Sequence, residues 1–374
     1  MSYPNIELGS VTEIRTGKLD ANASVEGGQF PFFTCSKNPL RIDNYSFDGE
    51  YVLVAGNGDL NVKHYIGKFD AYQRTYAIKS DQSQLYTKYL YYFLSKYVEV
   101  LRNLSIGGVI KYIKLGNLTE AKVPLPSLAE QQKIAAILDV ADQLRQKDQL
   151  LIDKYNALSQ ALFLDMFGDP KSNPRCWSVI QLQDVICDGP QNGLYKPSKE
   201  YGGGCPIVRI DSFFNDVVKT HSLKRIRASE DEMNKFEVAE GDFLINRVNS
   251  PSHLGKCGLM PKINERMVFE SNMMRIKFDR GLVSNMYMLY ILSSRYLKNQ
   301  ILNSSKDAVN QSSINQKDVN SFSIPLPPIT LQNQFAERIQ AIEAQKQQAQ
   351  ASLQKSEVLF NSLLQRAFKG ELTA

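Results

Sequence analysis

The apolar residues between positions 134 and 162 recur at intervals of three or four, a period of 3.5 residues that is typical of a coiled-coil helix. A second stretch, from 339 to 367, has the same period but a more polar face, because Lys346 and Ser356 stand in line with its apolar positions. Ser127 followed by Glu130 predicts the start of the first helix, and a glycine and two prolines within 167–174 predict its end. The residues expected to form the coiled-coil seam are Ile134, Ile137, Leu144, Leu151, Leu158, Leu162, Ile342, Leu353 and Leu363.

Each of these helices needs a partner for its apolar face, since short isolated helices are only marginally stable in water. The simplest arrangement is that the two faces bury each other. Because each helix follows a separate globular block, we expect an antiparallel coiled coil, with helices of roughly 60 Å at 1.5 Å per residue. The alternative is that each helix packs only on its own block.

The two helices belong to an internal duplication. The segment VPLPSLAEQQKI at 123–134 corresponds to IPLPPITLQNQF at 324–335, a shift of 201 positions, and this register continues without a gap to the end of both helices. Shorter matches precede it, such as GEYVLV at 49–54 with GDFLIN at 241–246. The shift grows from 174 near the start of the copies to 201, so the second copy carries about 27 extra residues in its loops.

The two globular blocks have a different pattern, with short β-type runs such as 50–56 and 241–247 and one helix-like apolar stretch in each block. There is no regular alternation of strands and helices, so we expect a mixed α/β (α+β) fold rather than a doubly wound nucleotide-binding fold. The predicted domains are two globular heads, each followed by a long helix in a pseudo-twofold arrangement: residues 1–123, 124–170, 171–323 and 324–374.

The charge distribution is compatible with a nucleic-acid partner without demonstrating one. The net charge is +5, with +2 in residues 1–123, −3 in 124–170 and +5 in 171–323. No apolar run reaches the length of a membrane span, and the five cysteines are scattered without a CxxC pair. We therefore expect a cytoplasmic protein without a disulfide framework.

Known catalytic signatures are missing from the sequence. It contains no GxxxxGK[ST] phosphate-binding loop, no GxSxG nucleophile elbow and no HExxH zinc motif, and its three histidines have no metal-ligand spacing. It also lacks the Asn-Pro-Pro-aromatic tetrapeptide that amino-methyltransferases use. We therefore expect a chain that is not an enzyme and holds no metal.

Polar side chains able to bind DNA bases and phosphates gather in two loops of each block, at equivalent places in the two copies. Alternatively, each of these residues, taken singly, belongs to an ordinary solvated loop with no ligand. The first block contributes the loops at 55–68 and 107–114, and the second block those at 246–256 and 308–315. The candidate DNA-binding residues are Asn57, Asn61, Lys63, His64, Lys68, Lys111, Tyr112, Lys114, Asn246, Arg247, Asn249, Ser250, His253, Lys256, Asn310, Gln311 and Ser312.

The duplicated Pro-Leu-Pro and Gln-rich segments resemble those of the specificity (S) subunits of type I restriction-modification enzymes. The opening CWSVIQLQDV of the second block and the helix ends LDMFGDP and RAFKGEL support the same resemblance, which extends over essentially the whole chain. The second copy departs from the pattern where Leu331 and Asn333 replace Glu130 and Gln132.

The resemblance implies two target recognition domains that each read half of a split double-stranded DNA site, with the coiled coil as spacer. It also implies two methyltransferase subunits as partners and, possibly, ATP-dependent restriction subunits. No cofactor would be bound by this chain itself, with S-adenosylmethionine on the methyltransferase and ATP and Mg on the restriction subunit. The rival hypothesis is a two-headed coiled-coil adaptor that binds proteins rather than DNA.

Overall fold

The computed structural model describes residues 3–214, 217–308 and 311–372. The chain forms two compact units, each made of one globular head and part of both long helices. The first unit contains residues 1–151 and 348–374, and the second contains residues 152–347. No helix within the described residues is both long and apolar enough to cross a membrane.

The first head is built on a six-stranded sheet covered by helix α1 (Thr87–Leu104). Neighbouring strands run antiparallel except β3 and β6, which run parallel. The sheet order is β2 (Thr12–Thr16), β7 (Thr75–Ser80), β5 (Phe47–Ala55), β6 (Val62–Ala71), β3 (Phe30–Phe33) and β4 (Leu40–Ile42). The short elements β1 (Asn5–Glu7), α2 (Gly116–Thr119) and β8 (Lys122–Pro124) complete the head.

The second head also has a six-stranded sheet, with order β10 (Ile186–Asn192), β19 (Met273–Phe278), β15 (Phe243–Asn246), β17 (Cys257–Leu259), β13 (Val217–Val218) and β12 (Phe213–Phe214). Two small sheets flank it: β14 (Lys224–Ile226), β11 (Tyr201–Val208) and β18 (Val268–Phe269); and β16 (Val248–Asn249), β21 (Gln311–Ser313) and β20 (Lys306–Ala308). The remaining elements are α4 (Glu230–Phe236), α5 (Asn285–Leu292), α6 (Arg295–Ser304), α7 (Gln316–Ser321), β9 (Ser178–Gln181) and β22 (Ser323–Leu326). Both heads therefore have the mixed α/β architecture that the sequence predicted.

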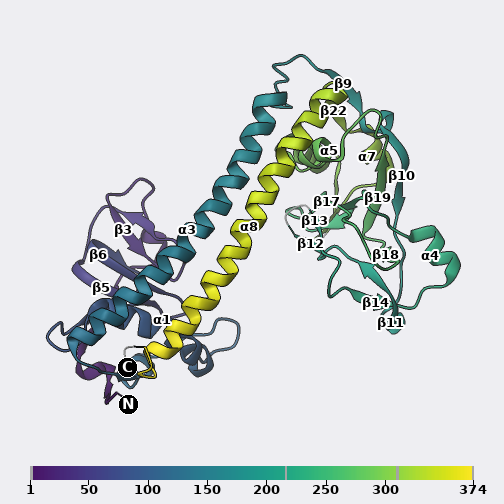
Figure 1. Cartoon of the computed structure of the whole chain (residues 1–374). Coiled ribbons are helices and arrows are strands. Elements are labelled where there is room, and N and C mark those ends of the chain that lie inside the picture. Colours follow the sequence, from purple (N-terminus) through teal and green to yellow (C-terminus); the bar gives the residue numbers. More distant parts are fainter. Residues whose placement is uncertain (1–2, 215–216, 309–310, 373–374) are drawn as a thin grey trace. The chain divides into compact units, whose positions relative to one another are not determined.

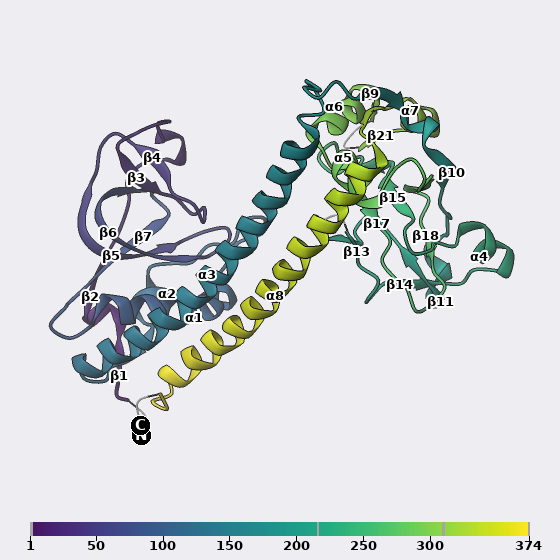
Figure 2. The same ribbon diagram turned by 45° about the horizontal axis from the view of Figure 1, so that its top comes forward.

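The long helices α3 (Leu128–Phe167) and α8 (Ile329–Ala367) pair in antiparallel fashion within each unit (Figures 1 and 2). In the first unit, Ile134 and Leu138 near the start of α3 share a core with Phe360 and Leu364 near the end of α8. In the second unit, Phe163 near the end of α3 contacts Phe335 near the start of α8, with ring centroids 5.7 Å apart. The prediction of an antiparallel coiled coil between the two duplicated helices is confirmed, although each helix also packs on its own head.

The seam within α3 differs from the sequence expectation at four positions. Ile137, Leu144, Leu151 and Leu158 are 38%, 44%, 40% and 50% exposed, whereas the residues that follow each of them are buried or half-buried. These following residues are Leu138, Arg145, Ile152 and Ser159. The seam keeps its 3.5-residue period, but the second core position of each heptad lies four rather than three residues after the first. Of the other predicted seam residues, Ile134 is buried and Leu162, Ile342, Leu353 and Leu363 are half-buried.

Polar residues meet in the middle of the seam. The carboxylate of Asp148, only 9% exposed, accepts hydrogen bonds from the hydroxyls of Ser352 (3.1 Å) and Ser356 (2.9 Å). The guanidinium of Arg145 lies over the ring of Phe360, 4.6 Å from its centroid. These bonds satisfy a buried carboxylate and hold the two helices at one register, because a shift of either helix would break them.

The first head is joined to its helix by a pair of buried side chains, Gln131 and Tyr89, both 0% exposed. The Gln131 amide nitrogen donates to the carbonyls of Gln84 and Pro126, each at 2.9 Å, and its oxygen accepts from the Tyr86 backbone nitrogen at 2.8 Å. The Tyr89 hydroxyl donates to the Pro124 carbonyl at 2.7 Å. We call this set of contacts the head–helix clasp.

The second copy repeats the clasp with Gln332 and Tyr287, which are also fully buried. The Gln332 amide nitrogen donates to the carbonyls of Leu282 (3.2 Å) and Pro327 (2.8 Å), and its oxygen accepts from the backbone nitrogen of Ser284 (2.9 Å). Tyr287 donates its hydroxyl hydrogen to the Pro325 carbonyl. The duplicated prolines therefore mark the point where each head meets its helix. Each Pro-Leu-Pro segment begins in a strand, β8 or β22, that pairs with the first strand of its head.

Candidate nucleic-acid interface

The two candidate loops of the first head come together in space. The loop after β5 meets the segment before α2 through hydrogen bonds from the Gly58 nitrogen to the Lys111 carbonyl (3.0 Å) and from the Ile113 nitrogen to the Gly56 carbonyl (2.9 Å). A β-bridge between Asn57 and Tyr112 adds to this contact. Residues separated by about 50 positions in the sequence thus form one surface.

The second head brings its two candidate loops together in the same way. Strand β16 pairs with β21, with Val248 opposite Ser313 and Asn249 opposite Ser312, and the Ile314 nitrogen donates to the Arg247 carbonyl at 2.9 Å. The sequence analysis singled out these four segments but did not predict that they would meet in pairs, or that parts of them would lie in β6, β15, β16 and β21. The two heads therefore present equivalent loop pairs built from different residues, as two readers of different sequences would require.

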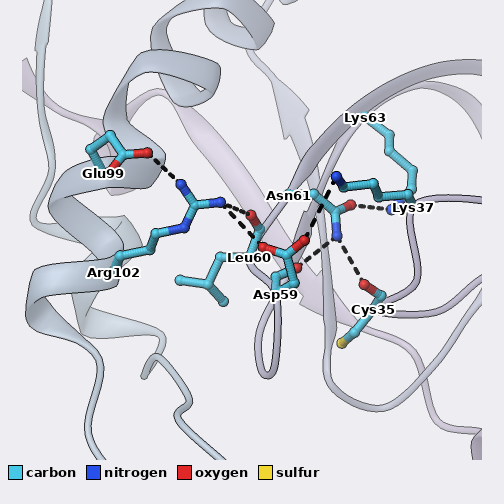
Figure 3. Close-up of polar contacts among 8 residues, drawn as sticks. All are labelled: Cys35, Lys37, Asp59, Leu60, Asn61, Lys63, Glu99 and Arg102. Atoms are coloured by element: carbon cyan, nitrogen blue, oxygen red, sulfur yellow. Dashed lines mark hydrogen bonds and ion pairs between the residues drawn. The ribbon is translucent and has the colours of Figure 1, made fainter. Parts of the chain in front are cut away.

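The loop after β5 in the first head is braced from several sides (Figure 3). Arg102 of α1 reaches the Asp59 carboxylate at 3.2 Å and the Leu60 carbonyl at 3.1 Å. The Asn61 amide nitrogen donates to the carbonyls of Cys35 (2.8 Å) and Asp59 (2.9 Å), while its oxygen accepts from the Lys63 ammonium group. These bonds occupy both amide hydrogens of Asn61, so Asn61 shapes the loop and has no donor left for a base.

The sequence analysis placed Lys63, His64 and Lys68 in this loop, but the structure puts them on strand β6, because the β5–β6 ladder extends from Val54 opposite Val62 to Phe47 opposite Phe69. These three cations differ in accessibility. Burial lowers the pKa of Lys63, whose ammonium group turns towards Asn61. The His64 ring bonds to the carboxylate of Glu50 at 2.7 Å. Lys68 is exposed and lies over the Tyr45 ring, 4.5 Å from its centroid, and the hydrogen bond with Tyr45 raises the pKa of Lys68. Lys68 pairs with Asp48 at the end of the β5–β6 hairpin that lies away from this loop. The exposed Lys111 and Lys114, beside the half-buried Tyr112, are therefore the cations of the loop pair best placed to meet a phosphate.

In the second head, Asn246 is fully buried at the end of β15, and its side-chain oxygen has no hydrogen-bond partner in the described part of the chain. Arg247 is half-buried and donates from Nη1 to the Ser271 carbonyl at 3.1 Å. Buried polar groups without a partner in the protein are uncommon. Asn246 and Arg247 are therefore among the inner, less exposed members of this loop pair.

The remaining candidate residues of the second head range from exposed to buried. Ser250 and His253 contact each other, Oγ to Nδ1, at 3.0 Å, and Asn249 accepts a bond from the Ser250 nitrogen at 2.8 Å. His253 and Gln311 are exposed, Lys256 is half-buried, and Ser312 is 2% exposed. Asn310 lies outside the described residues.

A basic pocket in the second head is the feature that the sequence analysis missed. It encloses about 740 Å³ and is lined by Lys196, Ser198, Tyr201, Gly202, Arg209, Lys224 and Arg225. Three of these cations have acidic neighbours: Lys196 lies 2.8 Å from Glu232, Arg209 lies 3.4 Å from Glu270, and Arg225 pairs with Glu265. Residues 194–227 contain seven Lys or Arg and three Asp or Glu, so this run could have signalled the pocket. Within the described ranges, no three His, Cys, Asp or Glu side chains gather in a way that could hold a metal ion.

Comparison with known proteins gives one consistent result. A family model described as the type I restriction modification DNA specificity domain matches residues 3–152 and 174–355. The specificity subunit of the type I restriction enzyme EcoDI from Escherichia coli is 28% identical, with 100% of this chain and 89% of that subunit aligned. The EcoKI specificity subunit from E. coli K12 is 26% identical over 75% of this chain and 64% of that subunit.

Solved structures agree at the level of the fold. The S subunit of a type I restriction-modification system from M. genitalium has a TM-score of 0.62 at 17% identity, covering 98% of this chain and 96% of that one. A chain from a study of type I R-M complex assembly and conformational transition has a TM-score of 0.53 at 16% identity, with 99% and 98% coverage. These findings give no support to the adaptor hypothesis. The chain belongs to the type I restriction-modification specificity family, and it is a non-catalytic DNA-recognition subunit.

Proposed function

We propose that this chain reads a bipartite DNA site, one half-site with each head, and that the paired helices fix the distance between the half-sites. The observation that carries this proposal is the repetition of the whole recognition assembly. Each copy has a head with a pair of polar loops and a clasp of the same four hydrogen bonds onto its own helix. Two equivalent heads with different loop residues suit two half-sites of different sequence.

Within this proposal, cations bind phosphates and the loop side chains select bases. In the first head the phosphate contacts at the loop pair are Lys111 and Lys114, which are exposed, and in the second head they are the half-buried Lys256 and the basic pocket. The base-selecting candidates are Asn57 and Tyr112 in the first head and Arg247, Asn249 and Gln311 in the second. Arg suits guanine and Asn or Gln suits adenine in the major groove.

We infer that methyltransferase subunits dock on the outer face of the helices. The exposed residues Ile137, Val140, Leu144 and Leu151 follow one side of α3, and Leu158 and Leu359 are exposed at positions that correspond under the shift of 201. An apolar stripe of this kind on a helix is typical of a protein-binding surface. In such a cytoplasmic complex, two methyltransferase subunits would bind S-adenosylmethionine, and restriction subunits would bind ATP and Mg. This chain itself would bind no cofactor.

The test is to replace residues 1–123 with the corresponding head of another specificity subunit and to map methylated adenines in cells that contain the methyltransferase partner. The proposal predicts that one half of the recognised site changes and that the other half and the gap stay the same. If both half-sites stay unchanged, or if both change, the assignment of one half-site to each head is refuted.

A further inference from the structure

The loop between α1 and α2 in the first head exposes two adjacent apolar side chains at its tip. Val109 is 103% exposed, more than any other large apolar side chain in the described residues, and Ile110 is 60% exposed. Exposed apolar side chains are common singly, but two β-branched residues side by side at a loop tip leave most of their apolar surface uncovered within their own head. Their place in the candidate interface therefore calls for an outside contact.

The backbone holds this tip in one shape. Ile106 and Tyr112 exchange hydrogen bonds, nitrogen to carbonyl, at 3.0 and 2.8 Å, and the Lys111 carbonyl accepts from the Gly58 nitrogen. Gly107 has a φ of +116°, and a Cβ added there would lie 2.5 Å from the Ile110 carbonyl oxygen, so only glycine fits. Because the turn is fixed, Val109 and Ile110 are presented outwards without a cost of ordering the loop on binding.

The chemistry around the tip favours DNA as the partner. Lys111 and Lys114 are exposed beside it. Cations next to an apolar tip are suited to DNA, which presents anionic phosphates beside apolar groups in its grooves. In the major groove, the apolar group of a base edge is the C5-methyl of thymine. Under the shift of 201, Asn310 and Gln311 occupy the corresponding positions in the second head's sequence, so the two heads differ here in the chemistry that they present.

We propose that Val109 and Ile110 contact thymine methyl groups in the half-site read by the first head, and thereby select thymine at one or two positions. This inference rests on the proposed function and adds a specificity-determining pair to it. It predicts that the first half-site contains a thymine whose methyl group contributes to recognition. The second head, with amide side chains at the corresponding positions, should not show the same dependence.

The experiment uses the complex of this chain with its methyltransferase partner and a duplex that carries the mapped site. Each thymine of both half-sites is replaced in turn by deoxyuridine, which lacks only the methyl group, and the dissociation constant is measured. For the wild-type chain we expect about a fourfold loss of affinity per contacted methyl at one or two positions of the first half-site. In the Val109→Ser/Ile110→Ser variant, thymine and deoxyuridine at these positions should bind equally well.

A Val179→Ser variant, which changes a 56% exposed valine on β9 of the second head, is the matched control and should keep the deoxyuridine effect. The melting temperature of each variant is compared with that of the wild type to exclude unfolding. The inference is overturned if no replacement of thymine by deoxyuridine in the first half-site lowers the affinity, or if the replacement still lowers it in the double serine variant. It is also overturned if the double serine variant loses binding to the methyltransferase subunit but keeps the wild-type response to deoxyuridine. Absence of any sequence-specific binding by the wild-type complex would instead refute the proposed function.

Discussion

The head–helix clasp gives a stability prediction that can be worked from its hydrogen bonds. Replacing Gln131 with Ala removes two donated bonds and one accepted bond, of which the bond to the Pro126 carbonyl is buried and those to Gln84 and Tyr86 are partly buried. A net hydrogen bond is worth about 1 kcal/mol, and an unsatisfied buried group costs about 1–3 kcal/mol. We therefore expect Gln131→Ala to lower the free energy of unfolding of the first unit by about 3 kcal/mol.

The same reasoning scales with the number of bonds removed. Tyr89→Phe deletes only the hydroxyl that bonds to the Pro124 carbonyl, so it should cost about 1 kcal/mol. Gln132→Ala changes the exposed neighbour of Gln131 on the same helix and should change stability by less than about 0.5 kcal/mol. Because Gln332 makes the same three bonds in the second copy, Gln332→Ala should match Gln131→Ala in size but act on the second unit.

Denaturant unfolding measures these free energies, and hydrogen exchange followed by mass spectrometry shows which segments of the chain are destabilised. In Gln131→Ala we expect faster exchange in peptides that cover 84–90 and 124–131, with the second head unchanged. If Gln131→Ala and Gln132→Ala destabilise equally, or if exchange rises equally in both units, the buried amide is not what joins each head to its helix.

Three further predictions concern charge and docking. Lys224→Gln should weaken DNA binding to all sequences alike and lower the slope of log affinity against log salt by about 1; a loss confined to one sequence would refute a phosphate contact. Burial raises the pKa of Glu270, so the folded protein holds this proton better than the unfolded chain, and the residue's contribution to stability falls as pH rises from the ordinary carboxyl pKa through the raised one. As the pH is raised from about 4, the free energy of unfolding of Glu270→Gln should therefore increase relative to that of the wild type. If the difference between the two free energies does not change with pH, the argument that burial raises this pKa is contradicted. Ile137→Ser/Leu144→Ser should abolish co-purification of the methyltransferase at an unchanged melting temperature, whereas Leu40→Ser, an exposed leucine on β4, should not; equal co-purification in both variants would exclude the stripe as the docking face.

The duplication made the architecture predictable, because a shift of 201 places two helices with matching faces after two similar heads. The seam was less predictable for a physical reason. Apolar residues stand at both of two consecutive positions, as with Ile137 and Leu138 or Leu151 and Ile152, so a 3.5-residue period fits either choice. Which residue is buried depends on the partner helix and on the head that packs against α3, and neither is visible in a local pattern.

The candidate site, too, could be predicted from the sequence only in part. Its four segments could be singled out because polar residues recur at equivalent places in both copies, although Lys63, His64 and Lys68 lie on a strand rather than in a loop. The direction of each side chain could not, because Asn61 is turned inwards by carbonyls of Cys35 and Asp59, one of which is far away in the sequence. The basic pocket was missed because its cations come from β14 and from the segments before and after β11, in the part of the second head where the copies diverge.

A map of methylated adenines in cells with and without this chain would show whether two heads on a fixed spacer determine the recognised sequence. If they do, we expect one recognised sequence made of two short specified segments, separated by a gap of a single length and unspecified bases, which disappears when the chain is absent. A contiguous recognised sequence, gaps of many lengths, or methylation that persists without the chain would contradict this expectation.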